Sequence, residues 1–421
     1  MFFTIINASL YLCLLYWYWR MHKTIDETFL LLAMWALVGF FGIFLVGSEP
    51  TRWKLQLWPF LYLFVTFLVF IQYLLRRKTH LFPINQFIKN NSVFLDIVNI
   101  LYIICAIYEL FNIDLAVLSF TYLSEEAQEL YAAAHEEVEL VKGPVFYAQR
   151  YTSAFFVLSA ISVFNYLAQG KRFFGWILFC FILVSIVAGN AQIAARGVMM
   201  SQVVIFVSIF LLYRPYLSHR IKKSIGIGAL IAGSIVSAFL IAITIARFSN
   251  NSETTGYDSP LESVVEYLGH SMLTFDYGIC DVDLKTWGGA RTFNYFARLL
   301  FGIDFRAMPD PGGHYGTAFT TFIGMLVQDF GYIGTIILGL AVSFIMYKMW
   351  SGKNRYTFAG MYIYVFYLNR MLMGVFVTPP GSDYTYAWAI LTYIILRFII
   401  KPVKGREKQK IPFTATEKLY V

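Results

Sequence analysis

Charged residues are scarce in this chain: Asp, Glu, Lys and Arg make up 14% of its 421 residues, against about 25% in soluble globular domains. Hydrophobic residues reach 58%, and this composition excludes a soluble enzyme. Cysteine is scarce as well, and three of the four cysteines (Cys13, Cys105 and Cys180) lie inside apolar segments, which excludes a disulfide framework. The six histidines are scattered singly, without HExxH or CxxC spacing, so we expect no metal site.

Nucleotide-binding motifs are absent too. No phosphate-binding loop occurs, and Asp329-Phe330-Gly331 spells a kinase motif without the rest of a kinase, so we expect neither nucleotide hydrolysis nor a cofactor. The net charge of +8 does not indicate a nucleic-acid partner, because the basic residues fall in short clusters between apolar runs. That distribution is typical of a membrane protein.

Long apolar runs recur along the chain, and a run of about 17–25 residues is long enough to cross a bilayer as a helix. We therefore expect an all-α polytopic membrane protein of about eleven transmembrane helices, forming a single membrane domain over residues 1–421. The expected spans are residues 2–19, 28–46, 57–75, 93–110, 151–168, 173–188, 197–213, 224–246, 332–349, 358–377 and 384–400. A shorter apolar stretch, 317–330, predicts a re-entrant or interfacial helix against the ninth span.

Lysine and arginine cluster in alternate connections between these spans, and the tail at 401–421 is strongly basic. The positive-inside rule makes this side cytoplasmic, so the N-terminus is expected in the periplasm and the C-terminus in the cytoplasm. Two long connections then fall on the periplasmic side of the membrane. Residues 111–150 predict an acidic amphipathic helix ended by Gly143-Pro144, and the long loop 247–316 predicts short helices near 260–277 and 293–301. Together they predict a helical periplasmic cap.

Several arginines lie on the side from which the positive-inside rule would remove them. Arg370 falls in the outer half of a span, where a charged side chain costs roughly 2.5–3.5 kcal/mol. Arg196 occupies a short outer turn, Arg247 ends a span, and Arg291 and Arg298 follow in the second outer loop. Each could instead pair with a carboxylate or reach lipid headgroups. Their concentration favours an anionic ligand, and because guanidinium binds phosphate bidentately, we expect a diphosphate.

Two motifs carry a resemblance to a known family. Arg196-Gly197 follows Gly189-Asn190 at the start of a central helix, and a Thr/Phe-rich stretch at 317–321 leads to Asp-Phe-Gly-x-x-Gly at 329–334. In these motifs and in its spans, the chain resembles the bacterial oligosaccharide repeat-unit polymerases, the Wzy-type O-antigen polymerases. The chain departs from the family at His314-Tyr315-Gly316-Thr317, where relatives often have Asn before the Thr.

The resemblance implies a membrane glycosyltransferase of GT-C-like fold in the bacterial inner membrane. Such an enzyme joins polyprenyl-diphosphate-linked oligosaccharide repeat units at the periplasmic face, in the synthesis of O-antigen or a related surface polysaccharide. The implied partners are the polyprenyl-diphosphate-linked glycan donor and acceptor, membrane lipids and a chain-length regulator protein.

A diphosphate leaving group needs fixed positive charge, which arginines supply without a metal. The candidates for binding the substrate diphosphate are Arg196, Arg370, Arg298, Arg291 and Arg247. A general base is also needed for the acceptor hydroxyl, and Asp276, His270 and His314 are candidates that the sequence does not rank. Two alternatives stay open: an O-antigen ligase, which uses the same donor, and a flippase or transporter for the lipid-linked oligosaccharide. Transporters often show inverted repeats and charges near mid-membrane, and neither is evident in this sequence.

Overall fold

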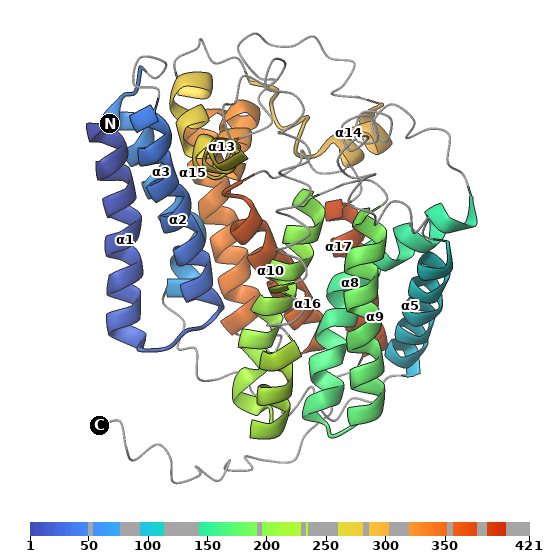
Figure 1. Ribbon diagram of the computed structural model, residues 1–421. Helices are drawn as coiled ribbons and strands as arrows, with labels where there is room; N and C mark the ends of the chain where they lie inside the picture. Colours follow the sequence, from blue (N-terminus) through green and yellow to red (C-terminus); the bar gives the residue numbers. More distant parts are fainter. Residues whose placement is uncertain are drawn as a thin grey trace.

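The chain folds into helices in a computed structural model that describes residues 1–48, 54–75, 93–112, 143–191, 196–228, 233–234, 260–280, 286–302, 320–351, 357–376 and 385–400. No strand occurs among these residues, as the all-α prediction requires. The main elements are α1 (Phe2–His22), α2 (Glu27–Ser48), α3 (Leu57–Leu75), α5 (Val93–Phe111), α8 (Pro144–Ala168), α9 (Arg172–Ala191), α10 (Arg196–Tyr213), α13 (Pro260–Thr274), the π-helix η3 (Phe275–Cys280), α14 (Asn294–Phe301), α15 (Phe322–Ser351), α16 (Phe358–Met373) and α17 (Thr385–Ile399) (Figure 1).

Membrane-length helices dominate the described part of the chain. Seven are long and apolar enough to cross a bilayer: Phe2–His22, Glu27–Gly47, Leu57–Leu75, Val93–Phe111, Pro144–Ala168, Met199–Tyr216 and Phe322–Met349. Two further apolar helices, Arg172–Ile186 and Ala387–Ile399, are shorter. The eighth expected span is described only at 224–228 and 233–234. The chain is thus a multi-helix membrane protein, and the count of about eleven spans stays a prediction.

Two groups of helices flank a centre made by α10, α15 and α16. One group contains α1, α2, α3 and α13, and the other contains α5, α8 and α9 (Figure 1). In the centre, the Trp35 ring of α2 stacks on Phe67 of α3 with ring centroids 4.1 Å apart. Its indole N–H donates to the Met371 carbonyl of α16 over 3.1 Å. The N-terminal helices are therefore bound to the C-terminal ones.

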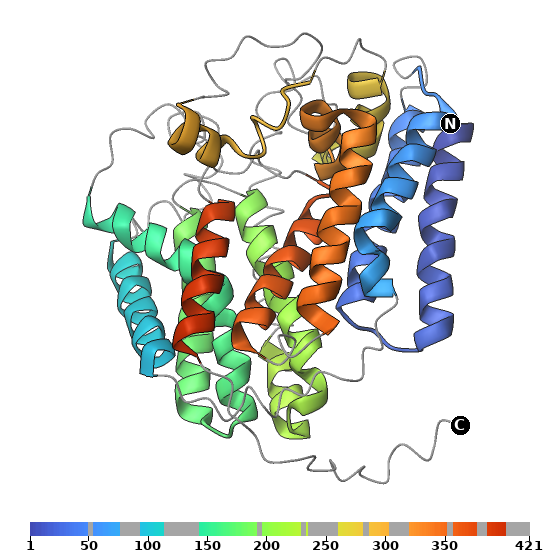
Figure 2. The same cartoon turned by 180° about the vertical axis from the view of Figure 1, so that it is seen from behind.

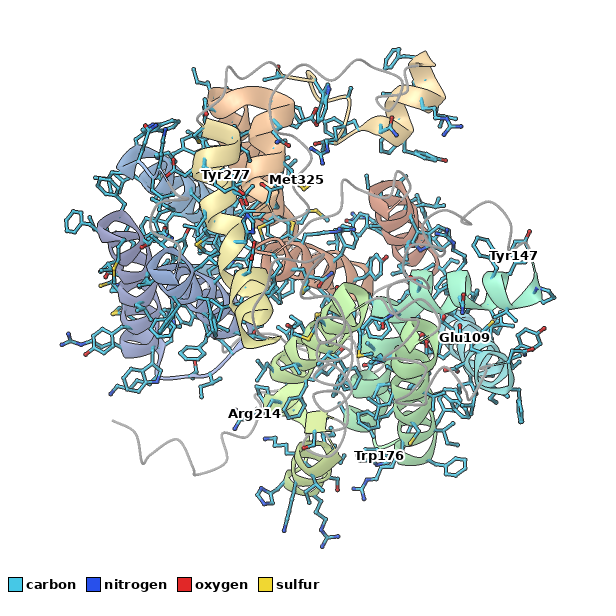
Figure 3. The ribbon with its side chains drawn as sticks, turned by 45° about the horizontal axis from the view of Figure 1, so that its top comes forward. Glu109, Tyr147, Trp176, Arg214, Tyr277 and Met325 are labelled. Carbon is cyan, nitrogen blue, oxygen red and sulfur yellow. The ribbon has the colours of Figure 1, made fainter. Side chains whose placement is uncertain are left out.

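A second contact joins the same two regions of the chain. The Tyr364 hydroxyl of α16 donates to Oε1 of Glu27, over 2.9 Å and across 337 residues of sequence. Glu27 is buried at the start of α2. In the other group of helices, the Thr152 hydroxyl of α8 donates to Oε1 of Glu109 in α5 over 2.6 Å (Figure 3). Buried carboxylates of the bundle thus accept hydrogen bonds from hydroxyl groups of neighbouring helices, as burial of polar groups requires.

The helix α15 folds back on itself at Gly331, whose φ of 72° and ψ of 177° are not helical. The bend divides α15 into a first arm, 322–330, and a second arm that begins at 332. Both arms contact the ring of Phe70 in α3, so they lie side by side. The centroid of this ring is 5.1 Å from that of Phe322 in the first arm, and a Cβ added to Gly339 in the second arm would lie 2.9 Å from the same ring. The first arm, 322–330, therefore does not extend the second. This agrees with the predicted short helix against the ninth span, and its re-entrant or interfacial place in the membrane stays a prediction.

One end of the bundle gathers the start of α1, the end of α2, the start of α3, α13 and η3. A small apolar cluster there contains Leu45, Val46, Phe60 and Leu273, with Phe3 and Tyr277 packed against it. We call this the α13 end, and α14 lies at the same end (Figures 1 and 2). The bounds of α13 with η3 and of α14 agree with the helices predicted near 260–277 and 293–301.

The other long connection differs from its prediction where the structure describes it. Residues 113–142 lie outside the described part, so the amphipathic helix predicted within 111–150 is described only at its edges. Pro144 was expected to end that helix, but it stands in the first turn of α8, which begins there rather than at 151. Proline suits this position because the first turn of a helix leaves its backbone N–H groups unused.

Candidate functional site

A loop before α14 docks on the bend of α15. Oδ1 of Asp329 accepts hydrogen bonds from the backbone N–H groups of Gly289 (3.0 Å) and Arg291 (3.3 Å). Its Oδ2 accepts from the backbone N–H of Thr292 (2.7 Å). The Asp329 side chain is fully buried. The aspartate of the Asp-Phe-Gly motif therefore holds a loop in place.

The bend itself explains why the loop docks here. At Gly331 the helical hydrogen-bond ladder is interrupted, and backbone carbonyls near such a break need other donors. The Gln328 carbonyl accepts from the Trp287 N–H over 3.3 Å, and the Asp329 carbonyl accepts from the Gly289 N–H over 3.1 Å. Gly289 has a φ of 92°, in the region that favours glycine, and this lets its N–H point at the bend.

The docked loop positions Arg291. Nη1 donates to Oε1 of Gln328 over 2.8 Å, and the guanidinium carbon lies 5.2 Å from the centroid of the Trp287 ring. The side chain is half-buried, and its Nε is buried without a hydrogen-bond partner among the described residues. No ion pair joins this guanidinium to a carboxylate in the described part of the chain.

The electrostatics of Arg291 follow from this position. Burial lowers the pKa of its guanidinium, while the Asp329 carboxylate raises that pKa. Arginine nonetheless stays protonated in proteins, so the group is a half-buried cation. Both Asp329 oxygens already accept backbone hydrogen bonds. A cation that is withdrawn from water and has no ion-pair partner gains stability from an anionic ligand.

Arg370 lies near the start of the first arm of α15. It stands in the last turn of α16, half-buried, with its guanidinium carbon 5.2 Å from the centroid of the Phe366 ring. Its carbonyl accepts from the Gly374 N–H over 3.0 Å, and the Gly374 carbonyl accepts from the Phe322 N–H over 2.7 Å. From Phe322 to Gln328 the arm rises about 9 Å. The arm therefore connects the neighbourhoods of Arg370 and Arg291.

The structure describes only some of the remaining arginine candidates and the base candidate His314. Arg196 begins α10, and its side chain lies outside the described part. Arg298 has an exposed side chain on α14. Arg247 and the base candidate His314 lie outside the described residues. Of the predicted anion-binding set, the structure thus places two half-buried guanidinium groups, Arg291 and Arg370, near the two ends of one arm.

His270 is held by groups on both sides of its ring. Its Nε2 lies 2.6 Å from the Tyr277 hydroxyl, and its Nδ1 lies 3.1 Å from Oε1 of Glu266, one helical turn earlier in α13. The side chain is buried. Nδ1 faces a carboxylate, and any proton that reaches His270 through Nε2 passes by way of Tyr277.

Asp276, the other described base candidate, has a structural contact. Its Oδ2 accepts from the Gln56 backbone N–H over 2.7 Å and ties η3 to the start of α3. The side chain is buried, at 1% exposure. An acceptor hydroxyl would therefore have to displace protein groups to reach this carboxylate.

Sequence reasoning missed four residues of this region. The spacing of Glu266 and His270, one helical turn apart, was the signal that could have found the first of them. Trp287 and Gln328 contact Arg291, but no sequence motif marks either residue. Tyr277 could not be distinguished from the many other aromatic residues of the chain. No group of three or more His, Cys, Asp or Glu side chains with metal-binding geometry occurs among the described residues.

Comparison with protein-family models, with curated proteins and with solved structures found no match for this chain. What the region can do chemically therefore rests on its own geometry. A half-buried guanidinium lies over an indole ring, 5.2 Å from its centroid, and donates to an amide oxygen, and it is held on a loop that a buried carboxylate fixes. This arrangement can bind an anionic group such as a phosphate.

Proposed function

We propose that the chain is a membrane glycosyltransferase that polymerises polyprenyl-diphosphate-linked oligosaccharide repeat units. The observation that carries the proposal is Arg291, a half-buried cation without an ion pair among the described residues, on a loop fixed by Asp329. A lipid-linked diphosphate supplies the charge that this cation needs. The family resemblance of 196–197 and 329–334 points to the same substrate.

The reaction exchanges one glycosidic bond for another. The bond between the anomeric carbon of the donor glycan and its diphosphate oxygen breaks, and the acceptor hydroxyl oxygen bonds to that carbon. The hydroxyl proton passes to a base, and the polyprenyl diphosphate leaves as an anion. Arg291, with Arg370 deeper along the arm, stabilises the charge that develops on the leaving oxygen, which is the role that a metal ion plays elsewhere.

Of the two described base candidates, we favour His270. Glu266 lies 3.1 Å from Nδ1 and fixes the orientation of the ring. The half-buried Tyr277 hydroxyl, 2.6 Å from Nε2, then relays the proton from the acceptor. Asp276 is less suited because its carboxylate is buried and already accepts from Gln56.

The proposal includes a GT-C-like fold in a bacterial inner membrane, with the α13 end in the periplasm. Reporter fusions test the orientation. A fusion after Glu137 is expected to be active only as a periplasmic reporter, and a fusion after Lys410 only as a cytoplasmic one. The reverse pattern would move Arg291 to the side where no lipid-linked glycan is polymerised.

A transporter of the lipid-linked oligosaccharide is the second candidate, and one observation favours it. Glu109 is buried in α5 at 1% exposure, and carboxylates within membrane spans often belong to ion or substrate pathways. A polymerase lengthens its substrate, whereas a transporter moves it unchanged. A ligase would transfer the same donor to lipid A-core.

Purified protein in liposomes, supplied with one lipid-linked repeat unit, separates these candidates. We expect products of two and more repeat units, which gel electrophoresis of the labelled glycan detects. The R291A variant is expected to abolish elongation and R291K to restore a part of it, because lysine lacks the planar fork. R214A is the matched control, since Arg214 is exposed and directly follows α10 (Figure 3). Elongation by R291A at the wild-type rate would contradict the proposal.

A further inference from the structure

The helix α14 lies apart from the membrane bundle and exposes an apolar face. Tyr295 is 39% exposed, Leu299 66% and Leu300 67%. At about 100° per residue, these three side chains and Phe296 fall on one side of the helix, while Asn294 and Arg298 fall on the other. The helix makes few contacts with other described helices. Its apolar face is therefore not covered by the described part of the chain.

Both ends of α14 are nevertheless fixed. Before it, Phe293 meets the Phe330 ring edge to face, with centroids 6.0 Å apart, and the Thr292 N–H is bound by Asp329. After it, Gly302 adopts a left-handed φ of 66°, and its N–H donates to the Arg298 carbonyl over 3.1 Å. The exposed face thus belongs to a helix with a defined start and end.

The position of α14 relative to the bundle bears on what covers this face. In both views it lies at the α13 end, beyond the start of α17 (Figures 1 and 2). The apolar helix α17 exposes Ile390, Leu391 and Ile394. An amphipathic helix beyond the end of a span lies at the depth where headgroups meet acyl chains.

We infer that α14 lies in the plane of the membrane surface, with Tyr295, Leu299 and Leu300 among the acyl chains and Arg298 at the phosphates. The exposed Arg298, beside the apolar face, has the charge that suits anionic headgroups. A second copy of the chain is the poorer occupant. The helix is about 12 Å long and about 10 Å wide, far less than the roughly 800 Å² that each partner of a stable dimer buries.

This inference needs only a membrane and does not rest on the proposed function. It has a consequence for Arg291, which precedes α14 by three positions. A surface-bound α14 holds this guanidinium at the level of lipid phosphates, so that a phosphate attached to a lipid reaches it without leaving the bilayer.

Site-specific fluorescence quenching of the full-length protein in single-copy nanodiscs tests the inference. A fluorescent amino acid is placed at Leu300 on the apolar face, at Arg298 on the polar face, and at Ile337, an exposed position in the long arm of α15. Nitroxide groups on the lipid acyl chains quench from the membrane, and iodide quenches from water. Each variant must elute from gel filtration like the unmodified protein.

We expect the probe at 300 to be quenched by the lipid nitroxides at least half as strongly as the probe at 337, and the probe at 298 to be quenched severalfold more by iodide. Strong iodide quenching at 300 would overturn the inference, because the face would then lie in water. Protection at 300 from both quenchers would also overturn it, since protein would cover the face. Because no glycan substrate is present, failure here leaves the liposome assay of elongation unaffected.

Discussion

Removal of the Asp329 carboxylate should undock the loop at 286–293. In the D329A variant the backbone N–H groups of Arg291 and Thr292 lose their acceptor, and that of Gly289 keeps only the carbonyl of residue 329. A hydrogen bond to a charged group contributes about 1.5–3 kcal/mol. The three bonds are not additive, and water satisfies the freed groups in part, so we expect a loss of about 3 kcal/mol of local stability. At about 1.4 kcal/mol per factor of ten, the open fraction of the loop rises roughly a hundredfold.

Hydrogen–deuterium exchange with mass spectrometry measures this opening, because local opening controls the exchange of the loop amides. Peptides covering 286–293 should exchange roughly a hundredfold faster in D329A, while peptides from α1 and α2 keep their rates. The matched control is D26N. Asp26 is also buried and accepts from the Phe29 N–H and the Tyr18 hydroxyl, but it lies between α1 and α2. Unchanged exchange of 286–293 in D329A would refute the view that the buried carboxylate fixes the loop.

Three other predictions concern the bundle, the bend and the chemistry. The T152V variant deprives the buried Glu109 of a donor and should lower the free energy of unfolding by about 1–3 kcal/mol, seen as a lower Tm in detergent; an unchanged Tm would contradict the role of this hydrogen bond. G331A places a side chain at a φ of 72° and a ψ of 177°, a region that is essentially restricted to glycine, and should cost about 1–3 kcal/mol. G47A, in open space, should not lower the Tm, and an equal effect of the two variants would contradict the role of the backbone conformation. Elongation in liposomes should persist in excess EDTA, and a requirement for added Mg²⁺ would count against catalysis by arginines alone.

Much of the architecture follows from local sequence signals. Apolar length alone predicted α1, α2, α3 and α5 to within a few residues, because lipid imposes both the length and the polarity of a span. The short first arm of α15 was predicted by the opposite signal, an apolar stretch too short to cross. Pro144 was assigned to the wrong helix because proline ends one helix or begins another, and only the path of the chain decides between them.

The candidate site was harder to predict, since its contacts join distant parts of the chain. Arg291 was selected for its charge and for its place on the predicted outer side of the membrane. Gln328, its hydrogen-bond partner, lies 37 residues further along the chain. Asp329 was recognised in a motif, and nothing local indicates that its carboxylate would bind backbone N–H groups of a loop. Backbone donors leave no trace in residue identity, so sequence patterns cannot show them.

The hydrogen bond between Glu27 and Tyr364 has a consequence for the time that the protein takes to be made. These two residues are separated by 337 positions, and ribosomes add about 5–20 residues per second. The helix α2 therefore stands in the membrane for roughly 17–67 seconds before the hydroxyl that binds its first carboxylate has been synthesised. During that interval the half-made chain carries a polar group that the finished bundle covers.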